Sequence, residues 1–415
     1  MIEPNGVLDP AAADDRRPLR PRGSNQIGLR QFNERVVLHA LRLHGALPKA
    51  ELARLTHLTP QTVQLIVGRL EADGLLRREA PLRGRVGQPS VPMALDPDGA
   101  YSIGLKVGRR SLDLLLMDFT AGIRERRTLS YEFPRPAEVL AHVAEGVAAF
   151  RKTLGRAQSR LQGLGIAAPL SLGGWQELLG LEPGEAVRWH DIDLAASIGE
   201  LDPVRDLPVL FAKDTSAACV AELVAGRGRS VPSFLYVFVD TFIGGGLVLD
   251  SQLQTGRHGN AGAIGSYPVA DPRRPGATGQ LLGVASLLNL ERLYRDARLD
   301  LGALVDDRAL TEPWRECTEA WLAEACLAIA QMLNGSACLL DVETVIVDGS
   351  FGRGLLQRLM ADLESALDRC NWEGVNRPTL LAGSIGSDAR ALGGALLPLH
   401  ANFSPDRKVF LKEGA

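Results

Sequence analysis

The sequence predicts an α/β protein in which a small helical unit precedes a larger body. Residues 24–95 show short helical apolar repeats followed by two strand-like runs. From Ala100 onward, strand-like apolar runs alternate with helical ones, which indicates mixed sheets covered by helices. The length of 415 residues and the 46% apolar content allow two or three domains with a sizeable core.

Three short helices are expected near the start. The segment 33–45, NERVVLHALRLHG, has helical apolar spacing and ends at Gly45. Pro48 suits the first turn of a second helix, because its missing N–H would be unpaired there. We expect its buried stripe to contain Ala50, Leu52, Ala53 and Leu55.

A third helix follows after a short turn. Thr59 can cap it with a hydroxyl, Pro60 occupies the first helical position, and the inward face is Val63, Ile66, Val67 and Leu70. The outward face offers Gln61, Thr62 and Gln64, whose short or amide side chains suit base edges, and Arg69, a cation placed for a phosphate.

The next segment is predicted to form a two-stranded wing. Its tip contains glycines that permit a tight reversal and polar or basic side chains that could enter a minor groove, namely Arg83, Arg85 and Gln88. A plain helical packing unit remains the alternative for residues 48–73 alone. With the wing attached, residues 24–95 are predicted to be a winged helix-turn-helix that binds double-stranded DNA.

The charge distribution agrees with this assignment. Residues 16–95 contain 14 Lys/Arg and 5 Asp/Glu, so a basic head precedes an acidic body, although the net charge of the chain is only −3. Clustered positive charge is expected of a nucleic-acid binder, because neutralised phosphates release counterions. A merely solvated basic surface is the alternative.

Composition excludes several other classes. The five cysteines are scattered and form no C-x-x-C pair, so neither a disulfide framework nor a zinc knuckle is indicated. No apolar run approaches the length of a membrane span, and residues 1–23, rich in Pro, Ala, Asp and Arg, are expected to be a flexible tail. We therefore expect a cytoplasmic protein without a membrane partner.

Four segments of the body resemble one protein family. They are RWHDIDLAASI (188–198), LPVLFAKDTSAACVAELVAG (207–226), VDTFIGGGLVLDSQLQTGRHGNAGAIG (239–265) and LLAGSIGSDARALGGALLPL (380–399). Their order and spacing are similar to those of the ROK family, which unites bacterial sugar kinases with sugar-responsive transcriptional repressors. The resemblance implies a two-lobed actin/hexokinase-like (ribonuclease H-like) body over residues 96–415. Its first lobe would span about 98–214 plus 388–400, and its second about 215–387.

The motifs of a sugar kinase are incomplete. Where the family's kinases have Asp-x-Gly-Gly-Thr, this chain has Lys106 to Arg110, and the second glycine-rich turn contains Asp240 and Phe242. A carboxylate there is expected to repel nucleotide phosphates. Asp214 matches the family's catalytic carboxylate, but it also precedes a helix that it could cap. We therefore expect no enzymatic activity and no catalytic residue.

The family's structural zinc site is also altered. Its His and three Cys correspond to Ser266, Arg273, Pro275 and Gln280, so we expect neither a metal nor any other cofactor.

The resemblance also suggests an effector pocket. The family's sugar-binding side chains correspond here to Ala263, Ser266 and Leu282, with Lys213 in place of an Asn and an upstream Asn near Glu185. A neutral hexose is therefore a poor match. Lys213, Arg109 and Arg110 could suit an anion, with salt bridging as the alternative for them. The candidate effector residues are Asp214, Lys213, Glu185 and Asn260.

The resulting prediction is a DNA-binding transcriptional regulator, most simply a repressor of carbohydrate-related genes that responds to a sugar or sugar derivative. A homodimer or dimer of dimers would read a pseudo-palindromic operator. Two alternatives remain: a ROK sugar kinase with a regulatory head, and a ligand-independent regulator whose body is only a scaffold.

Overall fold

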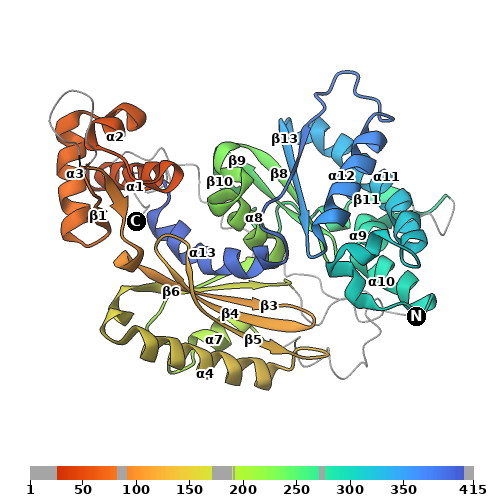
Figure 1. Cartoon of the computed structure of the whole chain (residues 1–415), viewed down its shortest axis with the longest axis horizontal. Coiled ribbons are helices and arrows are strands. Elements are labelled where there is room, and N and C mark those ends of the chain that lie inside the picture. The colour runs from red at the N-terminus through yellow and green to blue at the C-terminus, as the bar shows by residue number, and fades with distance from the viewer. Residues whose placement is uncertain (1–25, 82–90, 171–188, 190–191, 271–275, 406–415) are drawn as a thin grey trace, which may run out of the picture.

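The computed structural model describes residues 26–81, 91–170, 189, 192–270 and 276–405. A small head contacts a body built on two five-stranded sheets (Figure 1). The expected tail over residues 1–23 and the expected wing tip lie outside the described residues.

The head contains the three expected helices and a two-stranded antiparallel sheet. The elements are α1 (Gln26–His44), α2 (Lys49–Thr56), α3 (Pro60–Ala72), β1 (Leu76–Arg78) and β2 (Met93–Leu95). Val63, Ile66, Val67 and Leu70 are buried, as predicted. The assignment of Ala50 to the buried stripe was wrong: only Leu52 and Ala53 of the eight-residue α2 are buried, because this short helix turns one narrow edge toward its neighbours, and Ala50 is exposed.

The first sheet of the body has the strand order β5-β4-β3-β6-β7. β3 pairs antiparallel with β4 and parallel with β6, so the predicted hairpin across Gly108 to Arg110 is confirmed. Helices α4 (Pro136–Leu154) and α7 (Leu194–Gly199) belong to this half of the body. The strands are β3 (Tyr101–Val107), β4 (Ser111–Asp118), β5 (Ile123–Ser130), β6 (Leu161–Ala168) and β7 (Val209–Lys213).

The second sheet repeats the same plan. Its order β10-β9-β8-β13-β14 combines two antiparallel and two parallel pairings in the same sequence as the first sheet. Two similar units therefore follow one another, a duplication that the single sequence did not reveal. The strands are β8 (Phe234–Val239), β9 (Gly244–Leu249), β10 (Gln252–Gln254), β13 (Thr344–Gly349) and β14 (Thr379–Ala382).

Strand β8 is buried on both faces, and its side chains alternate between two cores. On one face, Leu235, Val237 and Val239 pack into the hydrophobic core that the second sheet forms with the helices between residues 281 and 367. Phe234, Tyr236 and Phe238 join a core that includes α8 (Asp214–Ala225) on the other. Because successive strand side chains point to opposite faces, an uninterrupted apolar run such as FLYVFV is what a doubly covered strand requires.

Helices α8 and α13 (Ala389–Phe403) cross closely between the two sheets (Figure 1). A Cβ on Gly393 would clash with the backbone oxygen of Ala217 in α8. A Cβ on Gly165 in β6 would clash with the backbone oxygen of Gly394. The glycines of the LGG stretch therefore allow the backbones of α13, α8 and β6 to approach one another.

The remaining helices cover the second sheet. They are α9 (Leu281–Ala285), α10 (Leu287–Asp296), α11 (Arg315–Leu340) and α12 (Arg353–Leu367), and a small hairpin joins β11 (Pro268–Ala270) to β12 (Thr278–Gln280). By length and composition alone α11 could cross a membrane, a possibility that the search for uninterrupted apolar runs missed. Its Trp321, Ile329 and Leu333 are buried against neighbouring elements of the second lobe, as in the core helix of a globular body.

Three arginines attach the head to the body. Arg35 of α1 donates to the backbone oxygen of Ala401, and Arg229 donates to the backbone oxygens of Arg42 and Leu43. Arg160 of the body donates to the backbone oxygen of Gly74, between α3 and β1 of the head, at 3.5 Å. Guanidinium groups thus satisfy carbonyls at the C-terminal ends of α1 and α13.

Candidate functional site

The start of α3 is well defined. Thr59 is its N-cap, and the Thr59 hydroxyl accepts a hydrogen bond from the Thr62 backbone N–H at 3.2 Å. Pro60 is the first helical residue, as predicted. The cap satisfies one otherwise unpaired N–H and fixes the direction in which the first turn presents its side chains.

That first turn presents two exposed amide side chains. Gln61 and Gln64 are exposed, on the face opposite the buried Val63 and Val67. Thr62 is half-buried, and its hydroxyl lies 2.8 Å from the Thr59 hydroxyl, so it supports the cap as well as facing outward. The glutamines are therefore the better placed groups for reading base edges.

Arg69 lies on the same helix and is already paired. It donates to the Glu34 carboxylate of α1 at 2.9 Å, although 44% of its side chain remains exposed. A phosphate would have to compete with Glu34 for it. Arg83, Arg85 and Gln88 lie outside the part of the chain that the structure describes, whereas the strands that carry this tip, β1 and β2, are paired in register from Leu76 with Leu95.

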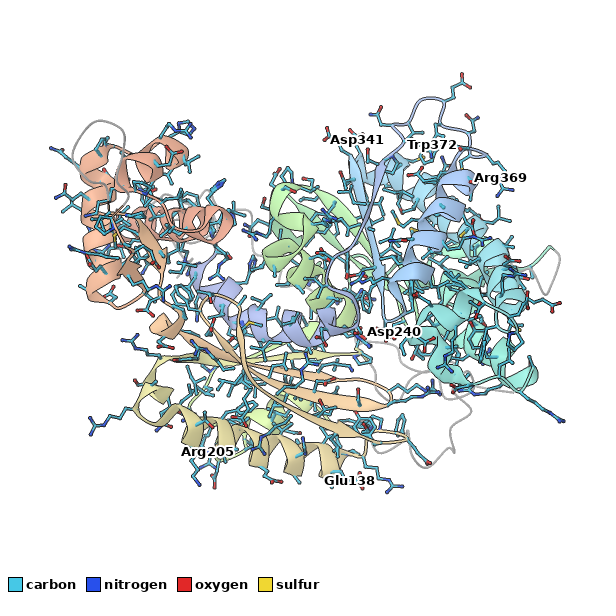
Figure 2. The ribbon with its side chains drawn as sticks, viewed as in Figure 1. Glu138, Arg205, Asp240, Asp341, Arg369 and Trp372 are labelled. Atoms are coloured by element: carbon cyan, nitrogen blue, oxygen red, sulfur yellow. The ribbon has the colours of Figure 1, made fainter. Side chains whose placement is uncertain are left out.

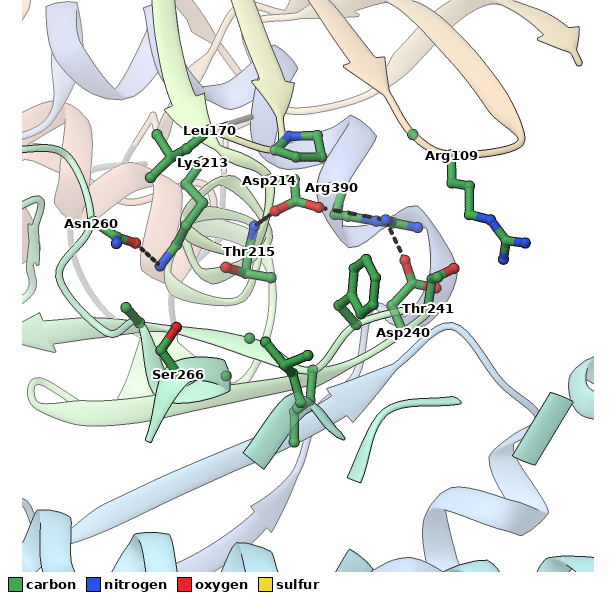
Figure 3. Close-up of a pocket in the computed structure, with 18 of the residues that line it drawn as sticks. Arg109, Leu170, Lys213, Asp214, Thr215, Asp240, Thr241, Asn260, Ser266 and Arg390 are labelled. Atoms are coloured by element: carbon green, nitrogen blue, oxygen red, sulfur yellow. Dashed lines mark hydrogen bonds and ion pairs between the residues drawn. The ribbon is translucent and has the colours of Figure 1, made fainter. Parts of the chain in front are cut away.

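The body contains a cavity of about 340 Å³ between its two halves, shown in close-up in Figure 3. Asp240, one of its lining residues, is labelled within the whole molecule in Figure 2. Lys213, Asp214 and Asn260 line it together, as the resemblance implied, whereas Glu185 lies outside the described residues. The three side chains come from the end of β7, the start of α8 and the loop after β10.

The ammonium group of Lys213 is hydrogen-bonded in this cavity to neutral groups. Its Nζ donates to the Asn260 Oδ1 at 3.2 Å and to the Ala261 backbone oxygen at 3.4 Å, both neutral acceptors. Burial lowers the pKa of Lys213, and the nearby Asp214 charge opposes this effect. A desolvated ammonium held by neutral acceptors can still gain from an added anionic or hydroxyl oxygen.

Arg390 of α13 connects the two halves of the body. Its guanidinium pairs with the Asp240 carboxylate after β8 and lies 3.7 Å from the Asp214 carboxylate (Figure 3). The guanidinium also lies 5.6 Å from the centre of the Phe238 ring. Burial lowers its pKa, but Asp240 and Asp214 outweigh burial and raise the pKa of Arg390.

This pairing corrects the electrostatic expectation for Asp240. The expected repulsion of nucleotide phosphates assumed an uncompensated carboxylate, and that assumption was wrong because Arg390 neutralises it. Asp214 is not a simple cap either. It is the first residue of α8, and its carboxylate accepts the Thr215 backbone N–H at 2.8 Å. Burial raises the pKa of Asp214, and Arg390 opposes the rise.

The arginines of the β3–β4 turn form salt bridges. Arg109 and Arg110 lie 3.5 and 3.0 Å from the Glu291 carboxylate of α10, so the salt-bridge alternative describes them. Arg109 also lines the cavity. Lys106 is held by Asp113 at 3.0 Å within the same hairpin, which directs that cation along the sheet.

The rest of the cavity wall is mostly apolar. Ala263, Ser266 and Leu282, which the resemblance aligns with sugar-binding positions, all line it. Apolar side chains from the first half and from the turn after β8 complete the wall: Phe133, Pro134, Pro169, Leu170, Phe242 and Ile243. Such a cavity can enclose a compact molecule with an apolar side and a few polar groups near Lys213, Asp214 and Asn260.

Two of the four altered zinc positions lie within the described residues. Ser266 and Gln280 are described, and neither side chain is a ligand that zinc prefers. Within the described ranges no three His, Cys, Asp or Glu residues gather at one place where a metal could bind. Arg273 and Pro275 lie outside those ranges.

Comparison with known proteins identifies the body. Residues 102–401 match the model described as the ROK family, and residues 31–85 match the model described as the MarR family. The chain belongs to the ROK family. The fold also agrees, because the structure resembles a crystal structure described as a ROK family transcriptional regulator, a homologue of the Escherichia coli MLC protein. That comparison has a TM-score of 0.64 and 19% identity and covers 91% of this chain and 98% of the other.

ROK relatives of two kinds align with the chain. The xylose repressor of Bacillus subtilis is 23% identical over 59% of this chain and 62% of its own length. An N-acetylmannosamine kinase of Escherichia coli O157:H7 is 28% identical over 71% of this chain and 97% of its own length. The kinase alignment spans 308 residues, about the length of the ROK family match over residues 102–401.

Arg390 is a site residue that the sequence did not predict. Its partners Asp240 and Asp214 precede it by 150 and 176 residues, and no local pattern links them. One signal was available: Arg390 is the sole Lys, Arg, Asp or Glu of the segment ARALGGALLPLHANF. A charge in an otherwise apolar helix is costly to bury and therefore points to a buried partner.

Proposed function

We propose that the protein is a sequence-specific DNA-binding transcriptional regulator, in the simplest case a repressor. The observation that carries this proposal is the capped start of α3, which exposes Gln61 and Gln64 on a head joined to a ROK body. The match of residues 31–85 to the MarR family model supports it. An amide side chain on a helix in the major groove can pair with adenine through two hydrogen bonds.

Selection from genomic DNA tests this proposal. The full chain is incubated with genomic fragments, the bound fragments are sequenced, and the selected duplex is compared with a scrambled duplex of equal composition. The regulator should prefer the selected duplex at least about a thousandfold, within the range of specific over non-specific binding. Equal affinity for both duplexes would contradict sequence-specific reading.

We further propose that the body cavity binds the effector of this regulator. Lys213, Asp214 and Asn260 would hold its polar groups, with Phe133 and Leu170 among the apolar contacts. The name of the xylose repressor supports a sugar or sugar derivative as the ligand. The desolvated Lys213 ammonium favours a derivative with an anionic group, such as a sugar acid, over a neutral hexose.

Thermal-shift measurements test the cavity. Xylose, glucose, N-acetylmannosamine and gluconate are each added to the wild-type chain and to Lys213→Met. We expect gluconate to give the largest rise in melting temperature and Lys213→Met to reduce it. If none of the four raises the melting temperature, the scaffold-only alternative gains support and this assignment is lost.

We propose that the same cavity does not catalyse phosphoryl transfer. The hairpin turn that would face a nucleotide carries Lys106, Arg109 and Arg110, each within hydrogen-bonding or ion-pair distance of a carboxylate of the body. No carboxylate at that turn replaces the family's magnesium-side Asp. A coupled ATP-turnover assay with the same sugars should therefore show no activity above that of Asp214→Ala. Turnover abolished by Asp214→Ala would establish the kinase alternative.

The proposed regulator acts as a homodimer or a dimer of dimers, because two recognition helices are needed to read a symmetric operator. Light scattering after gel filtration should give about twice or four times the 44.6 kDa of one chain. A monomer that still prefers its selected duplex would contradict the dimer.

A further inference from the structure

A second cavity, of about 610 Å³, lies at the junction between head and body. It shares no lining residue with the cavity between the halves of the body. The end of α1, the end of α8, the β9–β10 hairpin and the end of α13 each supply part of its wall. We name it the junction cavity. Its lining residues include Phe32, His39, Arg42, Leu43, Ser251 and His400.

Guanidinium groups dominate the positive charge at the junction cavity. Arg42 lines it, and Arg229 beside it donates to the Arg42 backbone oxygen at 2.8 Å. His39 also lines it, but burial lowers the pKa of His39, so its ring is not counted as a cation. Asp250 is the carboxylate among the described lining residues. Two guanidinium groups thus lie at or beside a wall that carries one carboxylate and that Leu43, Leu223 and Leu249 make partly apolar.

Arg42 is the arginine whose side chain lines the junction cavity. Its guanidinium stacks over the Phe119 ring at 5.3 Å from the ring centre, and no carboxylate of the described residues lies within 4 Å of it. Burial and the neighbouring Arg229 lower the pKa of Arg42 to about 10, and Asp118 opposes them only partly. A half-buried guanidinium that lies over an aromatic ring and has no carboxylate partner among the described residues has donors available for an anion.

We propose that the junction cavity is a ligand site for a small organic anion, in which Arg42 binds a carboxylate or phosphate group and the apolar wall receives the rest of the molecule. Such a ligand would touch α1 of the head and three elements of the body at once. Its binding would therefore alter the equilibrium between positions of the head. The effect on DNA rests on the proposed regulatory function, whereas the binding does not.

Isothermal titration of the full chain with three matched probes tests the binding. Phenyl phosphate and benzoate carry a phosphate and a carboxylate on the same ring, and benzyl alcohol is their neutral counterpart. At least one anion should bind at least about tenfold more tightly than the alcohol, and the comparison of the two anions distinguishes phosphate from carboxylate ligands. Equal binding of all three probes, or no binding of any, would overturn the proposal.

Variants locate the site. Arg42→Gln should weaken the anion at least about tenfold. Arg160→Gln removes the contact of Arg160 with the Gly74 backbone oxygen, another bond between head and body outside the junction cavity, so it controls for a loosened head and should bind the anion as the wild type does. If Lys213→Met and not Arg42→Gln abolishes binding, the anion occupies the other cavity and the proposal fails.

A second pair of variants tests the charge without removing Arg42. Ser251 lines the junction cavity with a backbone φ of +60°, a conformation that Asp and Asn tolerate. Ser251→Asp should weaken the anion several-fold, and the isosteric Ser251→Asn should not. Equal affinity in the two variants would contradict an electrostatic anion site. Operator affinity measured with and without phenyl phosphate then tests the regulatory consequence separately.

Discussion

The most informative side chains of the molecule are charges buried with their partners. Arg390 has 11% of its side chain exposed, and its partners Asp240 and Asp214 have 16% and 19%. Removing a buried charge from water costs several kcal/mol, so each of these groups depends on the others for compensation. Because they come from α13, the turn after β8 and the start of α8, the same pairing joins the two halves of the body.

Replacing the central cation should therefore destabilise the fold. Arg390→Met leaves two carboxylates without a counter-charge, and we expect it to lower the free energy of unfolding by about 3 kcal/mol or more. Arg358→Met is the control, because Arg358 forms an exposed pair with Asp362 and should cost less than about 1 kcal/mol. Urea unfolding measures both. Equal losses would show that the Arg390 network contributes no more than a surface pair.

Single side chains of α3 carry the predicted base contacts. Gln61→Ala should reduce discrimination between the selected and the scrambled duplex by about 1–3 kcal/mol while leaving non-specific affinity nearly unchanged. Thr62→Ala is a weaker test, because Thr62 also supports the Thr59 cap.

Arg85→Ala is expected to lower affinity on both duplexes and reduce the salt dependence. Competition titrations measure all three, and an equal loss on both duplexes for Gln61→Ala would contradict base reading.

His39 should make the head sensitive to acid. Burial and the charges of Arg42, Arg229 and His44 lower the pKa of His39 below its usual 6.5. The unfolded chain then binds more protons than the folded one below about pH 6.5, so the stabilising contribution is full above that pH and is lost as the pH falls. His39→Gln should lose less melting temperature than the wild type between pH 7.5 and 5.5. A larger or equal loss in the variant would contradict this assignment.

At the scale of elements, local sequence patterns predicted individual helices and strands. Helical spacing and the Thr59-Pro60 start predicted α3, and uninterrupted apolar runs predicted β3, β4 and β8. Ala50 was misplaced because periodicity does not reveal how narrow the contact edge of a short helix is. The Arg390 network and the junction cavity depend on elements far apart in the chain, which a single sequence does not bring together.

The close crossing of α8 and α13 should not tolerate a larger residue at Gly393. Gly393→Ala would push a methyl group into the backbone of α8 and should cost several kcal/mol, as overpacking does, or prevent folding. Gly283→Ala in α9 is the matched control: its Cβ would meet no atom within 4 Å, and the change should be neutral or slightly stabilising. Soluble yield and melting temperature report both. A Gly393→Ala variant as stable as Gly283→Ala would contradict the close approach.

For the whole molecule, the arrangement places a DNA-reading head on a body that has retained the kinase fold. The ROK body supplies a cavity with Lys213, Asp214 and Asn260, and arginines at three positions connect the head to it. A ligand that favours one arrangement of the two halves of the body can change DNA affinity through these contacts and through the packed core that the head shares with α13.

The most direct test of this account is a titration of the full chain against its selected operator and the scrambled duplex at several salt concentrations. We predict a strong preference for the operator at every concentration, together with an affinity that falls steeply and linearly on a logarithmic scale as salt rises. Equal binding to the two duplexes, or an affinity independent of salt, would contradict a protein that reads DNA through its head.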